Sequence, residues 1–183
     1  MAKVEPDNRP SRQELGTPHG EDIVETIRPF LWFDGKAQEA VDFYVSIFPG
    51  SKILETVSGP EGSVVGLTFQ LLDRTFMALN GGPHFTFTPA ISMFVPCQTQ
   101  DEIDTLWVKL TEGGTAQQCG WLTDRYGVSW QIVPTILGDL LKDQDRQRAN
   151  RVFKAMMAMR KLDIALLQNA HGQDEAVFSQ DGG

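Results

Sequence analysis

Two successive stretches of the chain repeat one order of predicted elements, and this repeat constrains the fold more than any other feature of the sequence. The first stretch has a strand over Thr26–Phe33, a helix over Ala37–Phe48 and three strands that end at Leu79. The second stretch begins with a strand at Ala90, continues with a helix, and ends with three short strands, the last at Val133. Aromatic and β-branched runs mark the strands, and apolar residues at helical spacing mark each helix. The sequence therefore predicts an α+β fold of two βαβββ modules.

The two modules can also be laid over each other residue by residue. An offset of 62 residues places Val41 on Ile103, and an offset of 51 residues places Asn80 on Gln131. Two amphipathic helices share apolar spacing by chance, but the matching order of elements favours an internal duplication.

The ends of the chain differ from this middle part. They are polar, with many charges, Pro and Gly, and carry no apolar period, so we expect a flexible N-terminal arm over residues 1–25 and a flexible tail over residues 171–183. Between them we expect one domain. Its predicted parts are the domain as a whole at 26–170, modules at about 26–80 and 90–134, and C-terminal helices at 135–170.

Composition excludes several classes of function. The formal net charge of −8 argues against nucleic acid as a partner, because a phosphate backbone requires a basic surface. No apolar run reaches the roughly 18 residues of a membrane span, and no apolar segment of a secretory signal follows the start. Two cysteines do not make a disulfide framework. We expect a cytoplasmic protein with no membrane partner.

Four segments carry a resemblance to a known family: PFLWFDGKAQEAVDFYVSIFPGSKI, FMALNGGPHFTFTPAISMFV, CGWLTDRYGVSWQIVP and MMAMRKLDIALLQNA. In this order they resemble the PhnB-like family of the vicinal oxygen chelate superfamily, which includes glyoxalase I and bleomycin-resistance proteins. The family is often labelled 3-demethylubiquinone-9 3-methyltransferase. The resemblance implies that the two modules close into a cupped mixed sheet and that two chains form a homodimer. It does not fix a reaction, because one fold supports many functions.

The same resemblance implies four metal-ligand positions in the cup, one on the first and last strand of each module. In this sequence they hold Phe30, Asn80, Ser92 and Gln131. A phenyl ring cannot bind a metal, and a hydroxyl with two amides supplies weak, neutral donors. We therefore expect no metal ion of the superfamily's kind and no other cofactor.

Aromatic and polar residues near the predicted cup are candidates for a ligand site. Large rings on strands can wall a pocket for a planar or apolar ligand, although core packing is the alternative for at least one of them. The candidate ligand-binding residues are Trp32, Asn80, Ser92, Trp121, Trp130 and Gln131. His84, in the NGGPHF stretch, is the candidate for proton transfer, and a structural role in a sharp connection between modules is its alternative.

These residues favour a protein that binds a small molecule in the cup without the superfamily's metal. One alternative is a metal-dependent enzyme of glyoxalase or dioxygenase type. Another is the labelled methyltransferase, although the sequence lacks the strand, Gly-rich turn and helix of a common S-adenosylmethionine site. The apolar stripe over Asp145–Asn169 predicts packing against a sheet or at the contact of a homodimer.

Overall fold

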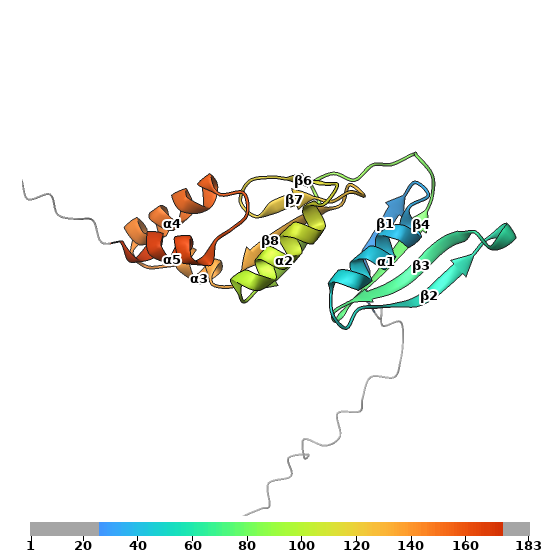
Figure 1. The fold of residues 1–183 in the computed structure, drawn as a ribbon, viewed down its shortest axis with the longest axis horizontal. Helices are drawn as coiled ribbons and strands as arrows, with labels where there is room; N and C mark the ends of the chain where they lie inside the picture. Colours follow the sequence, from blue (N-terminus) through green and yellow to red (C-terminus); the bar gives the residue numbers. More distant parts are fainter. Residues whose placement is uncertain (1–25, 174–183) are drawn as a thin grey trace, which may run out of the picture.

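The computed structural model describes residues 26–173 and shows the duplicated α+β architecture (Figure 1). The first module contains β1 (Phe30–Phe33), α1 (Ala37–Ile47), β2 (Lys52–Ser58), a single 3-10 turn (Pro60–Gly62), β3 (Val64–Leu71) and β4 (Arg74–Asn80). The second contains β5 (Met93–Cys97), α2 (Gln100–Thr111), β6 (Thr115–Ala116), β7 (Trp121–Thr123) and β8 (Ser129–Pro134). The predicted arm and most of the predicted tail lie outside the described residues.

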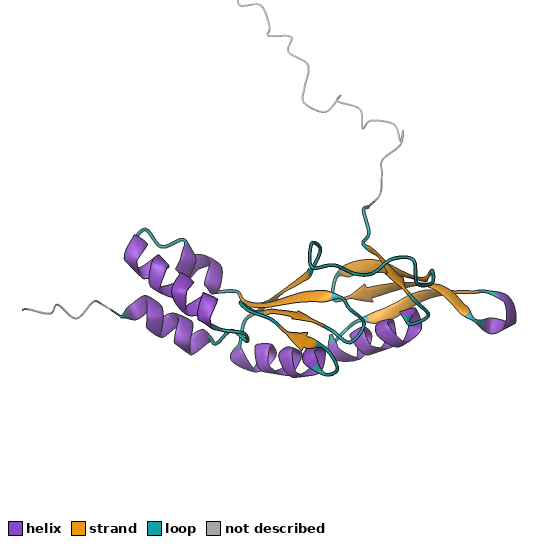
Figure 2. Cartoon of the chain, turned by 90° about the horizontal axis from the view of Figure 1, so that it is seen from above, coloured by secondary structure: helices purple, strands orange, loops and turns teal. Residues whose placement is uncertain are grey.

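Each module forms one mixed sheet of four strands, and the two sheets have the same topology. Their strand orders are β1-β4-β3-β2 and β5-β8-β7-β6, and the only parallel pair in each described sheet joins its first and last strand. Both α1 and α2 cover the same side of the two sheets, as Figure 2 shows. We call the opposite side the open face.

Side-chain alternation along the strands explains which face is covered. In β1, Leu31 and Phe33 are buried in the core under the helices, whereas Phe30 is 53% exposed and Trp32 is half-buried. In β8, Trp130 and Ile132 are buried in the same core. Because successive side chains of a strand point to opposite faces, Phe30 and Trp32 belong to the open face.

Asn80 holds the start of the first helix instead of lining the open face. Its Oδ1 accepts a hydrogen bond of 2.8 Å from the Ala37 N–H, and its Nδ2 donates to the Val64 carbonyl at 2.9 Å. Asn80 is also in register with Phe33, a buried core residue. The expectation that Asn80 and Gln131 point into one cup is therefore wrong for Asn80.

The cause of this error is one residue of register. β4 pairs Leu79 with Trp32 of β1, and β8 pairs Gln131 with Phe94 of β5. Leu79 is therefore the residue equivalent to Gln131. The two Asp-Arg pairs that suggested the offset of 51 lie in connections of different length, which is why they do not mark equivalent positions.

A buried carboxylate joins the two modules. Asp124, only 3% exposed, follows β7 and accepts hydrogen bonds from the Tyr44 hydroxyl of α1 at 2.7 Å and the Trp130 indole N–H at 2.8 Å. Its other oxygen accepts the backbone N–H groups of Tyr126 and Val128 at 2.8 and 3.0 Å. Burial, and then the charge of Asp124, raise the pKa of Tyr44 well above its usual value. Tyr44 therefore stays protonated and donates to the carboxylate.

Three further helices lie beyond the end of the second module (Figure 1): α3 (Leu137–Leu141), α4 (Arg146–Ala158) and α5 (Ile164–Gly172). They bury a core of their own, made of Leu137, Leu140, Val152, Leu162 and Leu167. The side chain of Gln100 in α2 connects them to the module, since it donates to the Leu162 carbonyl and accepts from the Ile164 N–H. Of the strand residues, Val133 at the end of β8 packs against this core, so contact with a sheet is more limited than expected.

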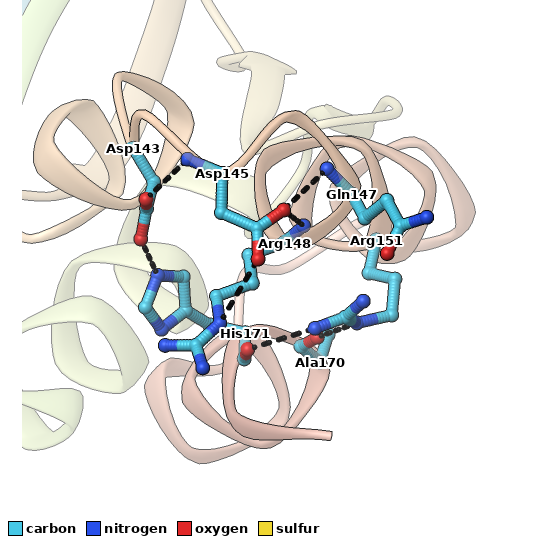
Figure 3. Close-up of polar contacts among 7 residues, drawn as sticks. All are labelled: Asp143, Asp145, Gln147, Arg148, Arg151, Ala170 and His171. Atoms are coloured by element: carbon cyan, nitrogen blue, oxygen red, sulfur yellow. Dashed lines mark hydrogen bonds and ion pairs between the residues drawn. The ribbon is translucent and has the colours of Figure 1, made fainter. Parts of the chain in front are cut away.

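A polar cluster fastens the end of α5 to the segment before α4 (Figure 3). His171 Nε2 lies 2.6 Å from Asp143 Oδ2, and the Arg151 guanidinium donates to the carbonyls of Ala170 and His171. A hydrogen bond from the Asp145 N–H, and then one from His171, hold the pKa of Asp143 below its usual value. The charged carboxylate therefore stabilises α5 above the ordinary carboxyl pKa, and its contribution is lost as the pH falls through the lowered value.

No helix within residues 26–173 is both long enough and apolar enough to cross a lipid bilayer.

Replacing Asp124 by Ala should destabilise the chain strongly. The change leaves the Tyr44 hydroxyl and the Trp130 N–H buried without their acceptor, so we expect the free energy of unfolding to fall by about 3 kcal/mol or more. Urea denaturation measures the change. Asp42→Ala, at an exposed carboxylate of α1, is the control, and a similar loss there would show that the buried network has no special weight.

Asn80→Ala should weaken the start of α1 by removing the acceptor for Ala37 and the donor to Val64. We expect the free energy of unfolding to fall by about 1–2 kcal/mol. The exposed amide of α4 provides the control, because Asn150→Ala should change stability by less than about 0.5 kcal/mol. Equal effects of the two substitutions would contradict the helix-starting role of Asn80.

Candidate functional site

An amide between two aromatic rings forms a row across the open face of the second module. Gln131 of β8 lies in register with Trp121 of β7 on one side and with Phe94 of β5 on the other. Leu122 and Ile132, their neighbours along the strands, are fully buried on the helix side. The row therefore faces away from α2, and residues in register across neighbouring strands lie close enough to touch one ligand.

Ser92, just before β5, is hydrogen-bonded to this row. The Nε2 atom of Gln131 lies 2.8 Å from Ser92 Oγ, and both residues are half-buried. Ser92 and Phe94 also line a cavity of about 510 Å³ between the second module and the first. The polar pair therefore lies beside apolar space large enough for a small organic molecule.

The equivalent row in the first module is apolar. There Leu79 of β4 lies between Trp32 of β1 and Gly66 of β3. Trp32 donates its indole N–H to the Gly82 carbonyl at 2.8 Å. The duplication has thus kept an aromatic ring on the first strand of each module, while the polar amide is present in the second module alone.

The connection between the modules packs directly on the first row. A Cβ atom at Gly81 would lie 2.2 Å from the Trp32 ring, so only glycine fits this approach. Phe85 meets Trp32 edge-to-face at a centroid distance of 5.1 Å, and Phe87 meets Phe33 in the same way. These contacts support a structural role for the two glycines of the NGGPHF stretch.

A second cavity, of about 430 Å³, lies between this connection, the start of α1 and the turn after β7. The charged groups on its wall are already paired. Lys36 contacts Glu39 at 2.9 Å, and Arg125 contacts Glu112 at 3.1 Å while its guanidinium lies over the Phe43 ring. This cavity therefore offers aromatic walls more than a free charge.

The structure brings together some of the residues expected at the site and separates others. Ser92, Trp121 and Gln131 gather on one open face, and Trp32 lies on the open face of the other module. Trp130, 2% exposed, points to the helix side and bonds Asp124, so it packs the core. The structure places Asn80 at the start of α1 and His84 exposed in the connection.

Phe94 was missed by the sequence reasoning, although a signal for it existed. The offset of 62 residues that relates the two helices also places Trp32 on Phe94. Phe94 is 58% exposed on its strand, which is unusual for a large ring away from a binding surface.

The donor groups of the open face do not suit a catalytic metal ion. With the corrected register, the four positions hold Phe30, Leu79, Ser92 and Gln131, which include no carboxylate, imidazole or thiolate. A catalytic zinc site normally has three such ligands. Within residues 26–173, no group of three or more His, Cys, Asp or Glu side chains could hold a metal ion.

The two thiols do not form an activated nucleophile with these groups. Burial raises the pKa of Cys97 to about 11, so this thiol stays protonated at neutral pH. Cys119 is half-buried in the connection before β7, where its sulfur lies 3.5 Å from the sulfur of Met157.

Comparison with known proteins gives one family and a consistent fold. Residues 25–133 match the family described as 3-demethylubiquinone-9 3-methyltransferase. A putative 3-demethylubiquinone-9 3-methyltransferase, PhnB protein, from Bacillus cereus is 39% identical; the match covers 61% of this chain and 100% of that chain, with a TM-score of 0.58.

Two further solved structures are more distant. A protein from Pseudomonas aeruginosa is 22% identical over 59% of this chain and 96% of its own, with a TM-score of 0.52, and shares the fold. A fosfomycin resistance protein from Listeria monocytogenes is 12% identical over 61% of this chain and 92% of its own, with a TM-score of 0.48. A search of the curated proteins gives no match.

The family match covers more than half of the chain, including both modules and the whole of the Trp121–Gln131–Phe94 row. Its fold is the glyoxalase and bleomycin-resistance type, in which two βαβββ modules follow one another. The chain belongs to the PhnB-like family that is described as 3-demethylubiquinone-9 3-methyltransferase.

Proposed function

We propose that this protein binds a small organic molecule on its open face and does so without a resident metal ion. The observation that carries the proposal is the Trp121–Gln131–Phe94 row, with Ser92 bonded to its amide. Half-exposed rings give a flat ligand apolar area and stacking partners. The amide and hydroxyl provide the small number of polar contacts that orient a ligand in such sites.

A metal-dependent reaction of glyoxalase or dioxygenase type is the first competing function. It requires anionic or imidazole ligands, and the four positions on the open face supply a phenyl ring, an aliphatic chain, a hydroxyl and an amide. These groups neither compensate the charge of a divalent ion nor activate a bound water. We therefore favour binding, and a role of His84 in proton transfer stays a prediction, as does a cytoplasmic location.

Methyl transfer is the second competing function, because the Bacillus cereus relative carries that name. A common S-adenosylmethionine site needs a parallel sheet with a Gly-rich turn leading from a strand into a helix. Both described sheets are mixed, with one parallel pair each, and the turn between β1 and α1 is Asp34-Gly35-Lys36. Calorimetry with S-adenosylmethionine tests this function directly, and tight binding would favour it over ours.

The neutral dye N-phenyl-1-naphthylamine tests the binding site, because its fluorescence rises in apolar surroundings. We expect the dye to bind the wild-type chain, and Trp121→Ala to weaken binding about tenfold through lost stacking area. Val108→Ala, at an exposed apolar residue of α2, is the matched control. Added Mn²⁺, Zn²⁺ or a chelator should leave the affinity unchanged.

Two results would contradict the proposal. A dye affinity that is the same in wild-type, Trp121→Ala and Phe94→Ala chains would show that the row binds nothing. One tightly bound metal ion per chain by elemental analysis, lost on Gln131→Ala, would restore the metal-dependent alternative.

We also propose that the chain is a homodimer whose contact includes the C-terminal helices. Apolar side chains on these helices remain about half exposed: Phe153 at 50%, Met157 at 50% and Leu166 at 53%. Exposed apolar groups that cluster on one element usually mark an interface. A symmetric pair of chains would cover both copies of this surface at once.

Light scattering tests the assembly. We expect a dimer for the wild-type chain at micromolar concentration and a monomer when Phe153, Met157 and Leu166 are all replaced by Ser. Val108→Ser removes an exposed apolar residue elsewhere and should leave the dimer intact. A wild-type monomer would refute the dimer, and a dimeric triple variant would remove these helices from its contact.

A further inference from the structure

The Ser92–Gln131 pair presents a fixed polar pattern to a ligand. With Gln131 Nε2 donating to Ser92 Oγ at 2.8 Å, the amide oxygen is left to accept and the serine hydroxyl is left to donate. If the amide is turned round, the hydroxyl donates to the amide oxygen, and the free groups are an amide N–H and a serine lone pair. In both arrangements the pair offers one donor and one acceptor side by side.

The surroundings of this pair are uncharged. The open-face residues of the three strands around it are Phe94, Pro96, Trp121, Thr123, Ser129, Gln131 and Val133. A ligand carboxylate or ammonium placed here would lose water without gaining an opposite charge, which is unfavourable. The face therefore selects against ionised ligands.

The two rings set the shape of the ligand. Trp121 and Phe94 lie on the strands at either side of β8, so their backbones are about 10 Å apart. One flat ring fits between two aromatic side chains at that separation, with its edge toward the amide. The Gln117–Thr123 pair, at 2.9 Å, is a second amide–hydroxyl pair in the same sheet, but it has no such rings in register beside it.

We propose that the Ser92–Gln131 pair selects uncharged, flat ligands that carry a carbonyl beside an N–H or O–H group, such as an aromatic carboxamide or a hydroxyl next to a ring carbonyl. The adjacent acceptor and donor of the ligand meet the adjacent donor and acceptor of the pair. This inference rests on the proposed small-molecule site and adds the chemical class of its ligand.

Three probes of nearly the same shape test this class: 2-naphthamide, its N,N-dimethyl derivative and 2-naphthoate. The first has a carbonyl and an N–H, the second lacks the N–H, and the third is charged at neutral pH. By equilibrium dialysis with the full chain, we expect 2-naphthamide to bind about tenfold more tightly than either of the others.

Substitutions in the pair should remove this preference without removing the site. Gln131→Leu and Ser92→Ala should each weaken 2-naphthamide about tenfold while changing the N,N-dimethyl probe by less than about twofold. Gln117→Leu, in the other amide–hydroxyl pair, is the matched control and should leave all three affinities unchanged. Circular dichroism and urea midpoints check that each variant is folded.

The outcomes separate this inference from the proposed function. Equal affinities for the three probes, or an unchanged preference in both folded variants of the pair, would overturn the polar selection while leaving an apolar site intact. Failure of every probe and of N-phenyl-1-naphthylamine at millimolar concentration would overturn the binding function, and the ligand class with it.

Discussion

The arrangement of the two modules depends on one carboxylate that is removed from water. Asp124 accepts four hydrogen bonds, all from neutral donors, and two of these come from side chains that belong to different modules. A buried charge is tolerated only when its hydrogen bonds are satisfied, so Tyr44 and Trp130 must both be in place. The contact that fixes α1 against the second sheet also turns Trp130 toward the core, away from any ligand.

The order of elements was predictable because a βαβββ unit has strong local signals: alternating strands, one amphipathic helix and Gly-rich stops. The helix offset was right, since Val41 and Ile103 are both fully buried under their sheets. The strand offset was wrong by one residue, because β4 and β8 are preceded by connections of different length. In a strand, one residue changes the face, and Asn80 therefore lies at a helix instead of in the cup.

The candidate site was partly predictable for the same reason. Gln131, Ser92 and Trp121 follow from their place on second-module strands, and the structure adds that the amide bonds the hydroxyl between two rings. Trp130 could not be separated from Trp121 by residue type, because the partner that holds it, Asp124, is recognised only once the turn after β7 has folded. Pairwise burial of polar groups is a property of the tertiary structure.

The absence of a side chain at Gly81 ties two parts of the molecule together. The bare backbone lies against the Trp32 indole, whose N–H is bonded to the next residue of the same segment. The linker and the aromatic wall therefore share one volume, and neither can change size alone. A smaller residue at position 32 would open space that a larger residue at position 81 could fill, so in evolution or in the laboratory these two positions should vary as a coupled pair.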